Sequence, residues 1–397
     1  MTSLAVAAAL LGDAMLYVVM PSRPELWHLT IAQVGILLSA NRFVRLLTNP
    51  MSSEIIRRFG VGKPFASAMW SSLIVLIIYA YSTNFLVLLL ARLLWGACWS
   101  VLRLGAQWTA LEHSSKFNLG LNLSYNASII RIGAIGGALF GGILSDYVGY
   151  REALLIFGLS TLVVTSIWSK KTLKQISKLT IQKEQQRRQY KNILVNPRIM
   201  VINCCALVVG LIWAGILSGT IGHYLRFRYG LELNFFTIAL GVTSFTGLVL
   251  GLRSFAEVFV GPLGGYLSDR YGRVRVLLIT LIFSAGCVMG LGVNLNVFNM
   301  LILLILAFTG GVLLNMQLLA LAGEIAQKIS RTETLSVYAT FQDFGSALGP
   351  IIGLSLIAST HLSLLYETSG IILLIFGLIF FVAFRRVSFE STSITSI

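Results

Sequence analysis

The strongest constraint on the fold is a series of long apolar stretches, most of them longer than the ~18 residues that mark a membrane-spanning helix. Charged residues make up only 11% of the 397-residue chain, against about 25% in soluble domains. The polar residues cluster between the apolar stretches. These features exclude an ordinary water-soluble enzyme and predict an all-α, multi-pass membrane protein.

The apolar stretches predict twelve transmembrane helices in two sets of six. The first set is expected near residues 3–21, 31–51, 65–83, 85–108, 122–144 and 152–168. The second set is expected near residues 199–222, 245–267, 275–294, 299–322, 334–357 and 365–384. Residues 1–168 and 199–397 then form two six-helix bundles, joined by a polar, basic linker at 169–198. Within 223–244, the stretch Leu233–Ser244 is either an interfacial segment or an extension of the eighth helix.

The distribution of Lys and Arg predicts the orientation in the membrane. The loops of one side, together with the linker and the C-terminal end, carry 20 of these residues, whereas the other side carries only Arg23, Arg151, Arg226 and Arg228. Basic residues in short loops stay in the cytoplasm, so we expect both termini and the linker there. The expected location is the plasma membrane, with the bacterial inner membrane as the first choice. The net charge of +15 is therefore attributed to topology and not to nucleic-acid binding.

The sequence carries no pattern typical of a metal site or of an enzyme. All four cysteines lie within apolar stretches, without the spacing of metal ligands. The motifs H-E-x-x-H, G-x-S-x-G and G-x-x-x-x-G-K-[ST] do not occur. We therefore expect no cofactor and no catalytic activity, and no direct use of ATP.

The two halves of the chain are related by a repeat with a constant spacing of 212 residues. The matched pairs are Pro50 and Pro262, Gly60 and Gly272, Lys63 and Arg275, Glu112 and Glu324, Lys116 and Lys328, Gly133 and Gly345, Gly137 and Gly349, Gly141 and Gly353, and Gly158 and Gly370. A parallel repeat of two six-helix halves is a known transporter architecture, with the substrate site between the halves near the middle of the membrane.

Several motifs resemble those of the major facilitator superfamily. The segment Gly265-Tyr-Leu-Ser-Asp269-Arg270-Tyr-Gly272-Arg273 is similar to the loop signature of that family, whereas the first-half copy at 53–63 has Arg57 in place of the acid. Gly133-x-x-x-Gly137-Ala-x-x-Gly141-Gly resembles the antiporter signature with alanine in the proline position, and Gly345-x-x-x-Gly349-Pro350 keeps the proline. Arg92-x-x-x-Gly96 resembles a further motif of the family.

The resemblance implies the twelve-helix major facilitator fold, with two pseudo-symmetric bundles and alternating access. It also implies that Asp269, with Arg270 and Arg273, forms a latch that closes the cytoplasmic side. The glycines at every fourth position let helices approach closely, and the resemblance implies that these contacts also seal one route through the carrier.

Charged residues inside the predicted helices point to a functional site, because a charge at the centre of a membrane helix costs ~2.5–3.5 kcal/mol on insertion scales. The basic residues are Arg42, Arg45, Arg92, Arg103, Arg131 and Arg253, and the acids are Asp13, Glu257 and Asp343. Arg253 and Glu257 are four residues apart and can neutralise each other. The remaining excess of arginine favours an anionic substrate; the alternative is that some arginines extend to the membrane surface or bind backbone carbonyls.

The fourth predicted helix carries a stripe of polar and aromatic residues at helical spacing. Its members are Arg92, Trp95, Trp99, Arg103 and Gln107. Arginine and tryptophan together suit a small amphiphilic or aromatic organic acid, although the tryptophans alone would fit packing equally well. The predicted substrate-binding residues are Arg42, Arg45, Trp95, Trp99, Arg103, Gln107 and Arg131.

Two acids are candidates for carrying a proton. Asp13 lies midway along the first helix, and Asp343 occupies the repeat position of Arg131. A buried carboxylate can take up and release a proton near neutral pH. Asp343 is expected to pair with Arg131; the alternative role of Asp13 is a fixed partner for an arginine such as Arg45. Arg92 is assigned to the same proton-coupling group.

The resemblance of the glycine series at Gly133 to the antiporter signature implies a secondary transporter that exports its solute in exchange for protons. Together with the buried arginines, it favours a small amphiphilic or anionic solute, such as a metabolite, a drug or a siderophore-like compound. The transporter is expected to function as a monomer in the lipid bilayer. One alternative is an uptake carrier or exchanger for organic or phosphorylated anions. A second alternative, from another class, is a membrane sensor that has kept the carrier fold without transport.

Overall fold

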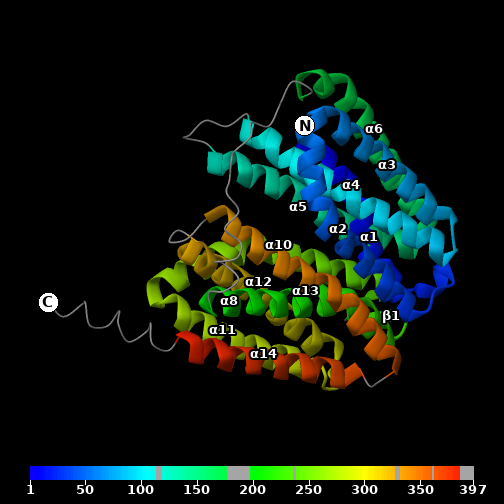
Figure 1. Ribbon diagram of the computed structural model, residues 1–397. Helices are drawn as coiled ribbons and strands as arrows, with labels where there is room; N and C mark the ends of the chain where they lie inside the picture. The colour runs from blue at the N-terminus through cyan, green and yellow to red at the C-terminus, as the bar shows by residue number, and fades with distance from the viewer. Residues whose placement is uncertain (113–118, 177–196, 236–237, 327–330, 360–361, 385–397) are drawn as a thin grey trace. The chain divides into compact units, whose positions relative to one another are not determined.

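The computed structural model describes residues 1–112, 119–176, 197–235, 238–326, 331–359 and 362–384, and helices make up nearly all of them (Figure 1). The helices of the first half are α1 (Thr2–Ser22), α2 (Ile31–Phe59), α3 (Gly62–Tyr81), α4 (Phe85–Glu112), α5 (Leu119–Tyr147) and α6 (Tyr150–Ile176), with a short 3-10 turn, η1 (Pro24–Trp27). The second half begins with α8 (Pro197–Val209), a π-helical segment η2 (Gly210–Leu217) and α9 (Ser218–Tyr229). It continues with α10 (Val242–Tyr271), α11 (Arg273–Gly290), α12 (Val297–Ala326), α13 (Arg331–Ser359) and α14 (Leu362–Phe384).

A helix is present at each of the twelve predicted positions. Nine spans in the described part of the chain are long and apolar enough to cross a membrane, and α8, η2 and α9 together form one of them. The other three long helices are α2, α10 and α13, which carry Arg42 and Arg45, Arg253 and Glu257, and Asp343. The charges that suggest a site also lower the apolar character of these helices.

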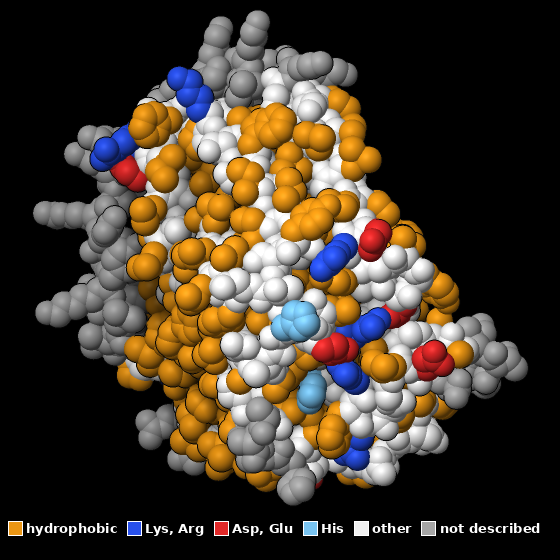
Figure 2. All heavy atoms as spheres, turned by 90° about the vertical axis from the view of Figure 1, so that its right-hand side faces the viewer, with side chains coloured by type: hydrophobic (Ala, Val, Ile, Leu, Met, Phe, Trp, Pro, Cys, Tyr) orange, Lys and Arg blue, Asp and Glu red, His pale blue; other side chains and the backbone are white. Residues whose placement is uncertain are grey.

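Apolar side chains cover much of the face shown in Figure 2. Leu86, Ile132 and Ile279 are each about two-thirds exposed. An exposed apolar surface of this extent marks a contact with a partner or with lipid, and the length of the helices identifies the lipid bilayer here.

Most of the stretch Leu233–Ser244 is not an extension of the eighth helix, and its location at the membrane interface stays a prediction. Helix α9 continues to Tyr229, and an antiparallel hairpin of β1 (Glu232–Phe235) and β2 (Ile238–Gly241) follows, with Leu233 paired to Leu240. Helix α10 begins at Val242. Gly230 has a φ of 85°, a conformation that glycine adopts without strain and that allows the chain to leave the helix.

The chain divides into two compact units. Unit 1 contains Met1–Glu184 and Ser218–Ser254, and unit 2 contains Gln185–Leu217 and Phe255–Ile397. The division into bundles at 1–168 and 199–397 stays a prediction. Helix α6 continues to Ile176, so the first residues of the predicted linker are helical, and residues 177–196 lie outside the described part.

Glycines bring helix backbones together in both units. A side chain at Gly133, Gly137 or Gly141 on α5 would collide with α1 at Ala7, Leu11 and Met15, respectively. In unit 2, Gly345 on α13 faces the backbone of Leu207, and Gly349 faces Gly215. Close backbone approach of this kind is how membrane helices gain packing energy where lipid supplies no hydrophobic drive.

We predict that Gly137→Ala destabilises the protein, because its new Cβ meets the backbone of Leu11 and neither helix can yield locally. Overpacking of this kind typically costs ~1–3 kcal/mol. The matched control is Gly158→Ala on α6, where an added Cβ meets nothing within 4 Å. Thermal unfolding in detergent, followed by size-exclusion chromatography, measures both variants. Equal unfolding temperatures for the two variants would show that the α1–α5 approach is not close.

Candidate functional site

A buried ion pair joins the middle of α1 to α4. Arg92 donates through Nη1 to Oδ1 of Asp13, and the two side chains are 1% and 12% exposed. Asn41 on α2 donates to the same carboxylate oxygen at 3.4 Å. Asp13 therefore has Arg92 as its partner and not Arg45, the arginine named as its example partner from the sequence. Arg45 lies half-buried on α2.

Aromatic rings surround the guanidinium of Arg92. Its Cζ lies 5.2 Å from the ring centroid of Tyr17 and 5.7 Å from that of Tyr79. The hydroxyl of Tyr79 donates to the carbonyl oxygen of Leu88 at 2.9 Å, which fixes that ring. Nε and Nη2 of Arg92 are buried and have no hydrogen-bond partner among the described residues. The ion pair and the two rings thus hold a full positive charge within the helices.

Further arginines of unit 1 converge on Tyr17. The Cζ of Arg42 lies 5.2 Å from this ring. Arg253 on α10 lies within electrostatic range of Arg42, Arg131 and Tyr17, and it donates to the hydroxyl of Ser218. We call Arg42, Arg92, Arg131 and Arg253 the basic cluster. The predicted partner of Arg253, Glu257, has a side chain that lies outside the described residues.

The stripe on α4 changes from buried to exposed along the helix. Trp95 is buried and belongs to the packing of unit 1, and its ring centroid lies 6.2 Å from that of the half-buried Trp99. Arg103 is half-buried and Gln107 is exposed. Their contact with a substrate stays a prediction.

The motif that begins at Arg92 has a direct structural explanation. Gly96, one turn beyond Arg92, lies so close to α2 that an added Cβ would meet the backbone oxygen of Asn41 at 2.5 Å. The glycine therefore holds α4 against α2, where Asn41 donates to Asp13.

Arg131 and Asp343 lie in different units, on α5 and α13. Both are half-buried, and their pairing stays a prediction.

The loop signature occupies a turn that requires glycine. Gly60 between α2 and α3 has a φ of 73°, and Gly272 between α10 and α11 has a φ of 92°, so the repeat preserves a backbone conformation that other residues rarely adopt. Arg273 donates to the carbonyl oxygen of Ala320 at 3.0 Å and lies 3.4 Å from the carboxylate of Glu324. The sequence pattern gave no role to Glu324 beyond its match with Glu112.

The other residues of this loop lie near the surface. Arg270 donates to the hydroxyl of Tyr266 at 3.0 Å. The side chain of Asp269 lies outside the described residues, so the cytoplasmic latch stays a prediction. In the first-half copy, Arg57 and Arg58 bind Glu54 and hold the pKa of that exposed carboxyl below its usual value.

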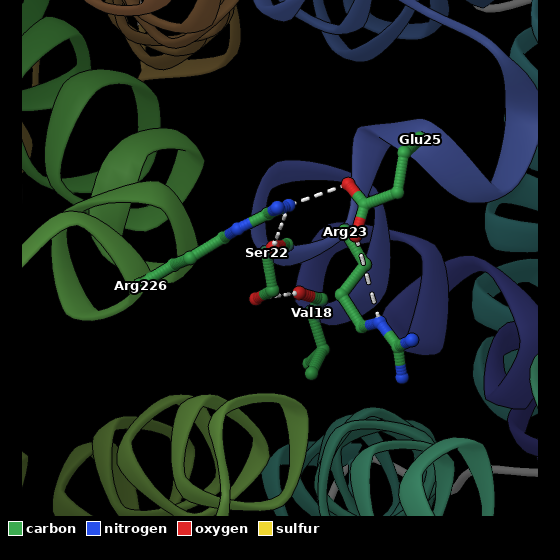
Figure 3. Close-up of polar contacts among 5 residues, drawn as sticks. All are labelled: Val18, Ser22, Arg23, Glu25 and Arg226. Carbon is green, nitrogen blue, oxygen red and sulfur yellow. Dashed lines mark hydrogen bonds and ion pairs between the residues drawn. The ribbon is translucent and has the colours of Figure 1, made fainter. Parts of the chain in front are cut away.

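A second group of polar contacts in unit 1 was not found from the sequence. Arg226 on α9 pairs with Glu25 and donates to the carbonyl oxygen of Ser22 at 3.1 Å (Figure 3). The hydroxyls of Ser22 and Thr246 lie 3.3 Å apart. The one available signal was that Arg226 is among the few basic residues on the predicted non-cytoplasmic side.

Asp146 at the end of α5 contacts α10, the helix that follows α9 and the hairpin. Its Oδ2 accepts hydrogen bonds from the backbone N–H and the hydroxyl of Ser244, both at 2.7 Å. The hydroxyl of Thr243 donates to the carbonyl oxygen of Gly142 at 3.0 Å. A carboxylate at the first turn of a helix is favoured by unpaired N–H groups and by the helix dipole. Together with the contacts of Arg226 shown in Figure 3, these hydrogen bonds join α1 and α5 to α9 and α10.

The long apolar helices, with charges buried among them, define a multi-pass membrane protein. Its sequence matches the family model of the major facilitator superfamily over residues 2–252 and 240–396. The chain belongs to this superfamily, and its family and fold point to a transporter and not to an enzyme.

Curated relatives match part of the chain. A multidrug resistance protein MdtG of Escherichia fergusonii is 26% identical over 233 residues, which cover 57% of this chain and 54% of the relative. The MdtG of Salmonella heidelberg is 24% identical over 269 residues, which cover 66% of this chain and 62% of the relative. The chain thus matches less than two thirds of the length of these relatives.

Two solved structures share the fold. One is a bacterial homologue of the human lysosomal transporter Spinster in an inward-facing, occupied conformation, with a TM-score of 0.75, 15% identity and coverage of 97% of this chain and 95% of that one. The other is the nucleoside transporter NupG, with a TM-score of 0.75, 13% identity and coverage of 97% and 98%.

We predict that Arg92→Met destabilises the protein strongly, because it leaves the Asp13 carboxylate buried without its partner. Breaking a buried pair in this way typically costs ~3–5 kcal/mol. The double variant Asp13→Asn with Arg92→Met removes both charges and should recover most of the loss.

Thermal unfolding of the single and double variants in detergent tests this prediction. Arg58→Met, which breaks an exposed pair with Glu54, serves as the control and should unfold close to the native protein. A double variant as unstable as Arg92→Met would show that the ion pair does not account for the effect.

Proposed function

We propose that this protein is a secondary active transporter that works by alternating access and exports a small amphiphilic or anionic organic solute in exchange for protons. We place it in the bacterial inner membrane as a monomer, with both termini in the cytoplasm. The name of the matched relatives, multidrug resistance protein, supports export.

The observation that carries the proposal is the buried pair of Asp13 with Arg92, which is itself a member of the basic cluster. When Asp13 takes up a proton, it loses the charge that holds Arg92, and the positive field of the cluster grows. Protonation of Asp13 therefore changes both the charge that the solute meets and the contact between α1 and α4. Because the same ion pair affects the solute and the helices that carry the site, it is a physical basis for coupling.

The contacts of Arg226 and Asp146 supply the gate that this cycle needs. They lie at the helix ends that the charge distribution predicts to be non-cytoplasmic. Alternating access requires such contacts to form and break in each cycle. In the proposed mechanism they close the non-cytoplasmic side while solute enters from the cytoplasm.

We predict that an imposed pH gradient drives export and that Asp13→Asn loses this response. Proteoliposomes are loaded with a fluorescent organic anion that the protein transports, and the outside is then acidified. Native protein should release the solute several-fold faster, because inward proton flow is coupled to outward solute flow. Asp13→Asn should ignore the gradient and still exchange labelled for unlabelled solute, because solute binding does not need the proton.

Asp343→Asn is tested in the same way. If this variant, and not Asp13→Asn, ignores the pH gradient, the proton is carried by Asp343. Native protein that ignores the gradient would contradict proton coupling. Counterflow driven by an anion gradient alone would then favour the exchanger.

We predict that a disulfide between Ser22→Cys and Thr246→Cys stops transport. The native hydroxyls lie 3.3 Å apart, so an oxidant should join the two cysteines and hold the gate closed. A reducing agent should restore the rate, and each single-cysteine variant should be insensitive to both reagents. Full transport by the cross-linked protein would show that this contact does not open during the cycle.

A further inference from the structure

Unit 2 contains a cluster of neutral hydrogen-bonding side chains that the proposed mechanism does not use. Asn315 lies on α12, and Tyr338 and Gln342 lie on α13. Gln342 donates through Nε2 to Oδ1 of Asn315 at 2.6 Å, and the hydroxyl of Tyr338 donates to the same oxygen at 3.3 Å. We call these three residues the amide cluster.

The amide cluster has hydrogen-bonding capacity left over. Because Oδ1 of Asn315 accepts both bonds, its Nδ2 keeps two N–H donors, and Oε1 of Gln342 remains an acceptor. No residue in the described part of the chain binds these atoms. Asn315 and Gln342 are only half-buried, so a molecule that approaches the cluster can reach them.

A neighbouring side chain on α8 is also incompletely paired. Asn203 is 1% exposed, and within the described residues neither its Nδ2 nor its Oδ1 has a hydrogen-bond partner. It lies on the stretch of α8 between Ile199, which packs against Val337, and Leu207, which faces Gly345. Because Val337 and Gly345 lie on either side of Tyr338 and Gln342 on α13, Asn203 lies at the same height along the helix pair as these two residues. Unpaired amides within membrane helices are costly, and a ligand that pairs with them offsets this cost.

The repeat places one member of the amide cluster, Asn315, at the position equivalent to a residue predicted to bind substrate in the first half. At the spacing of 212 residues, Asn315 corresponds to Arg103, and Asp343, next to Gln342, corresponds to Arg131. At this position the first half thus carries a positive charge, whereas the second half carries an uncharged amide.

From this arrangement we infer that Asn315, Gln342 and Tyr338 form a subsite that binds an uncharged hydrogen-bonding group of the solute, such as a hydroxyl, carbonyl or amide. The inference rests on the proposed function and narrows its substrate class to organic anions that also carry a neutral polar group. Asn315 supplies the N–H donors, Gln342 supplies the acceptor, and Tyr338 holds the amide of Asn315 in place.

The test measures the affinity of purified protein for matched anions that differ by one hydroxyl. The probes are the pair para-hydroxycinnamate and cinnamate and the pair cholate and deoxycholate, with Kd values from isothermal titration calorimetry. Native protein should prefer the member with the additional hydroxyl roughly five- to tenfold, the effect of one or two hydrogen bonds. Asn315→Leu and Gln342→Met should reduce this preference to about one, and Tyr338→Phe should reduce it in part.

Two control variants separate the subsite from general damage. Gln317→Leu removes another amide of α12, one that donates to Thr280 at 3.2 Å, and should keep the preference. Arg103→Gln should weaken both members of each pair equally. Because each preference is a ratio within one variant, a partial loss of folded protein does not alter it.

The outcomes distinguish the inference from the proposed function. A native preference near one, or a preference that survives both Asn315→Leu and Gln342→Met, would overturn the subsite and leave anion binding intact. If native protein binds no anion in either pair, the proposed substrate class fails and the subsite fails with it.

Discussion

A charge within the hydrocarbon region of a membrane has no water to bind, so the protein itself has to supply its partners. The pair of Asp13 and Arg92 meets this requirement, and much of unit 1 is arranged around it. Asn41 binds the same carboxylate from α2, and Gly96 lets α2 and α4 approach closely enough for that bond. The rings of Tyr17 and Tyr79 flank the guanidinium. One carboxylate on α1 therefore collects contacts from both α2 and α4.

The two halves share the glycines that form turns and close helix contacts, but they differ in their polar groups. Gly60 and Gly272 make the same kind of turn, and Gly133 and Gly345 bring equivalent helices together. The ion pair is not repeated. In unit 2, Trp213 lies in the π-helical segment and donates to the carbonyl oxygen of Ala307 at 2.6 Å. Ala307 occupies the repeat position of Trp95. The close helix contacts thus follow the repeat, whereas the polar and charged residues differ between the two halves.

Hydropathy and the repeat were sufficient to predict the fold class and most of the helices, because long apolar runs have few alternatives in a membrane. The hairpin of β1 and β2 was missed because four-residue strands are too short to show a pattern. At the candidate site, the buried charges could be identified from the sequence, but their pairing could not. Several arginines are compatible with Asp13 on spacing alone, and only the packing of α1 on α4 selects Arg92. The contacts of Arg226 and Asp146 join residues roughly 100 to 200 positions apart, and no local periodicity connects them.

The short hairpin has a mechanical consequence for the end of unit 1 where α9 and α10 meet. Its ladder runs from Glu232 paired with Gly241 to Phe235 paired with Ile238, and the N–H of Val242 donates to the carbonyl oxygen of Leu231 at 2.8 Å. The last turn of α9 and the first turn of α10 are therefore fastened to each other by backbone bonds. Arg226 lies on one of these turns and Ser244 on the other. The hairpin therefore links the turn that presents Arg226 to Glu25 with the turn that presents Ser244 to Asp146, so these two contacts are mechanically connected through the backbone.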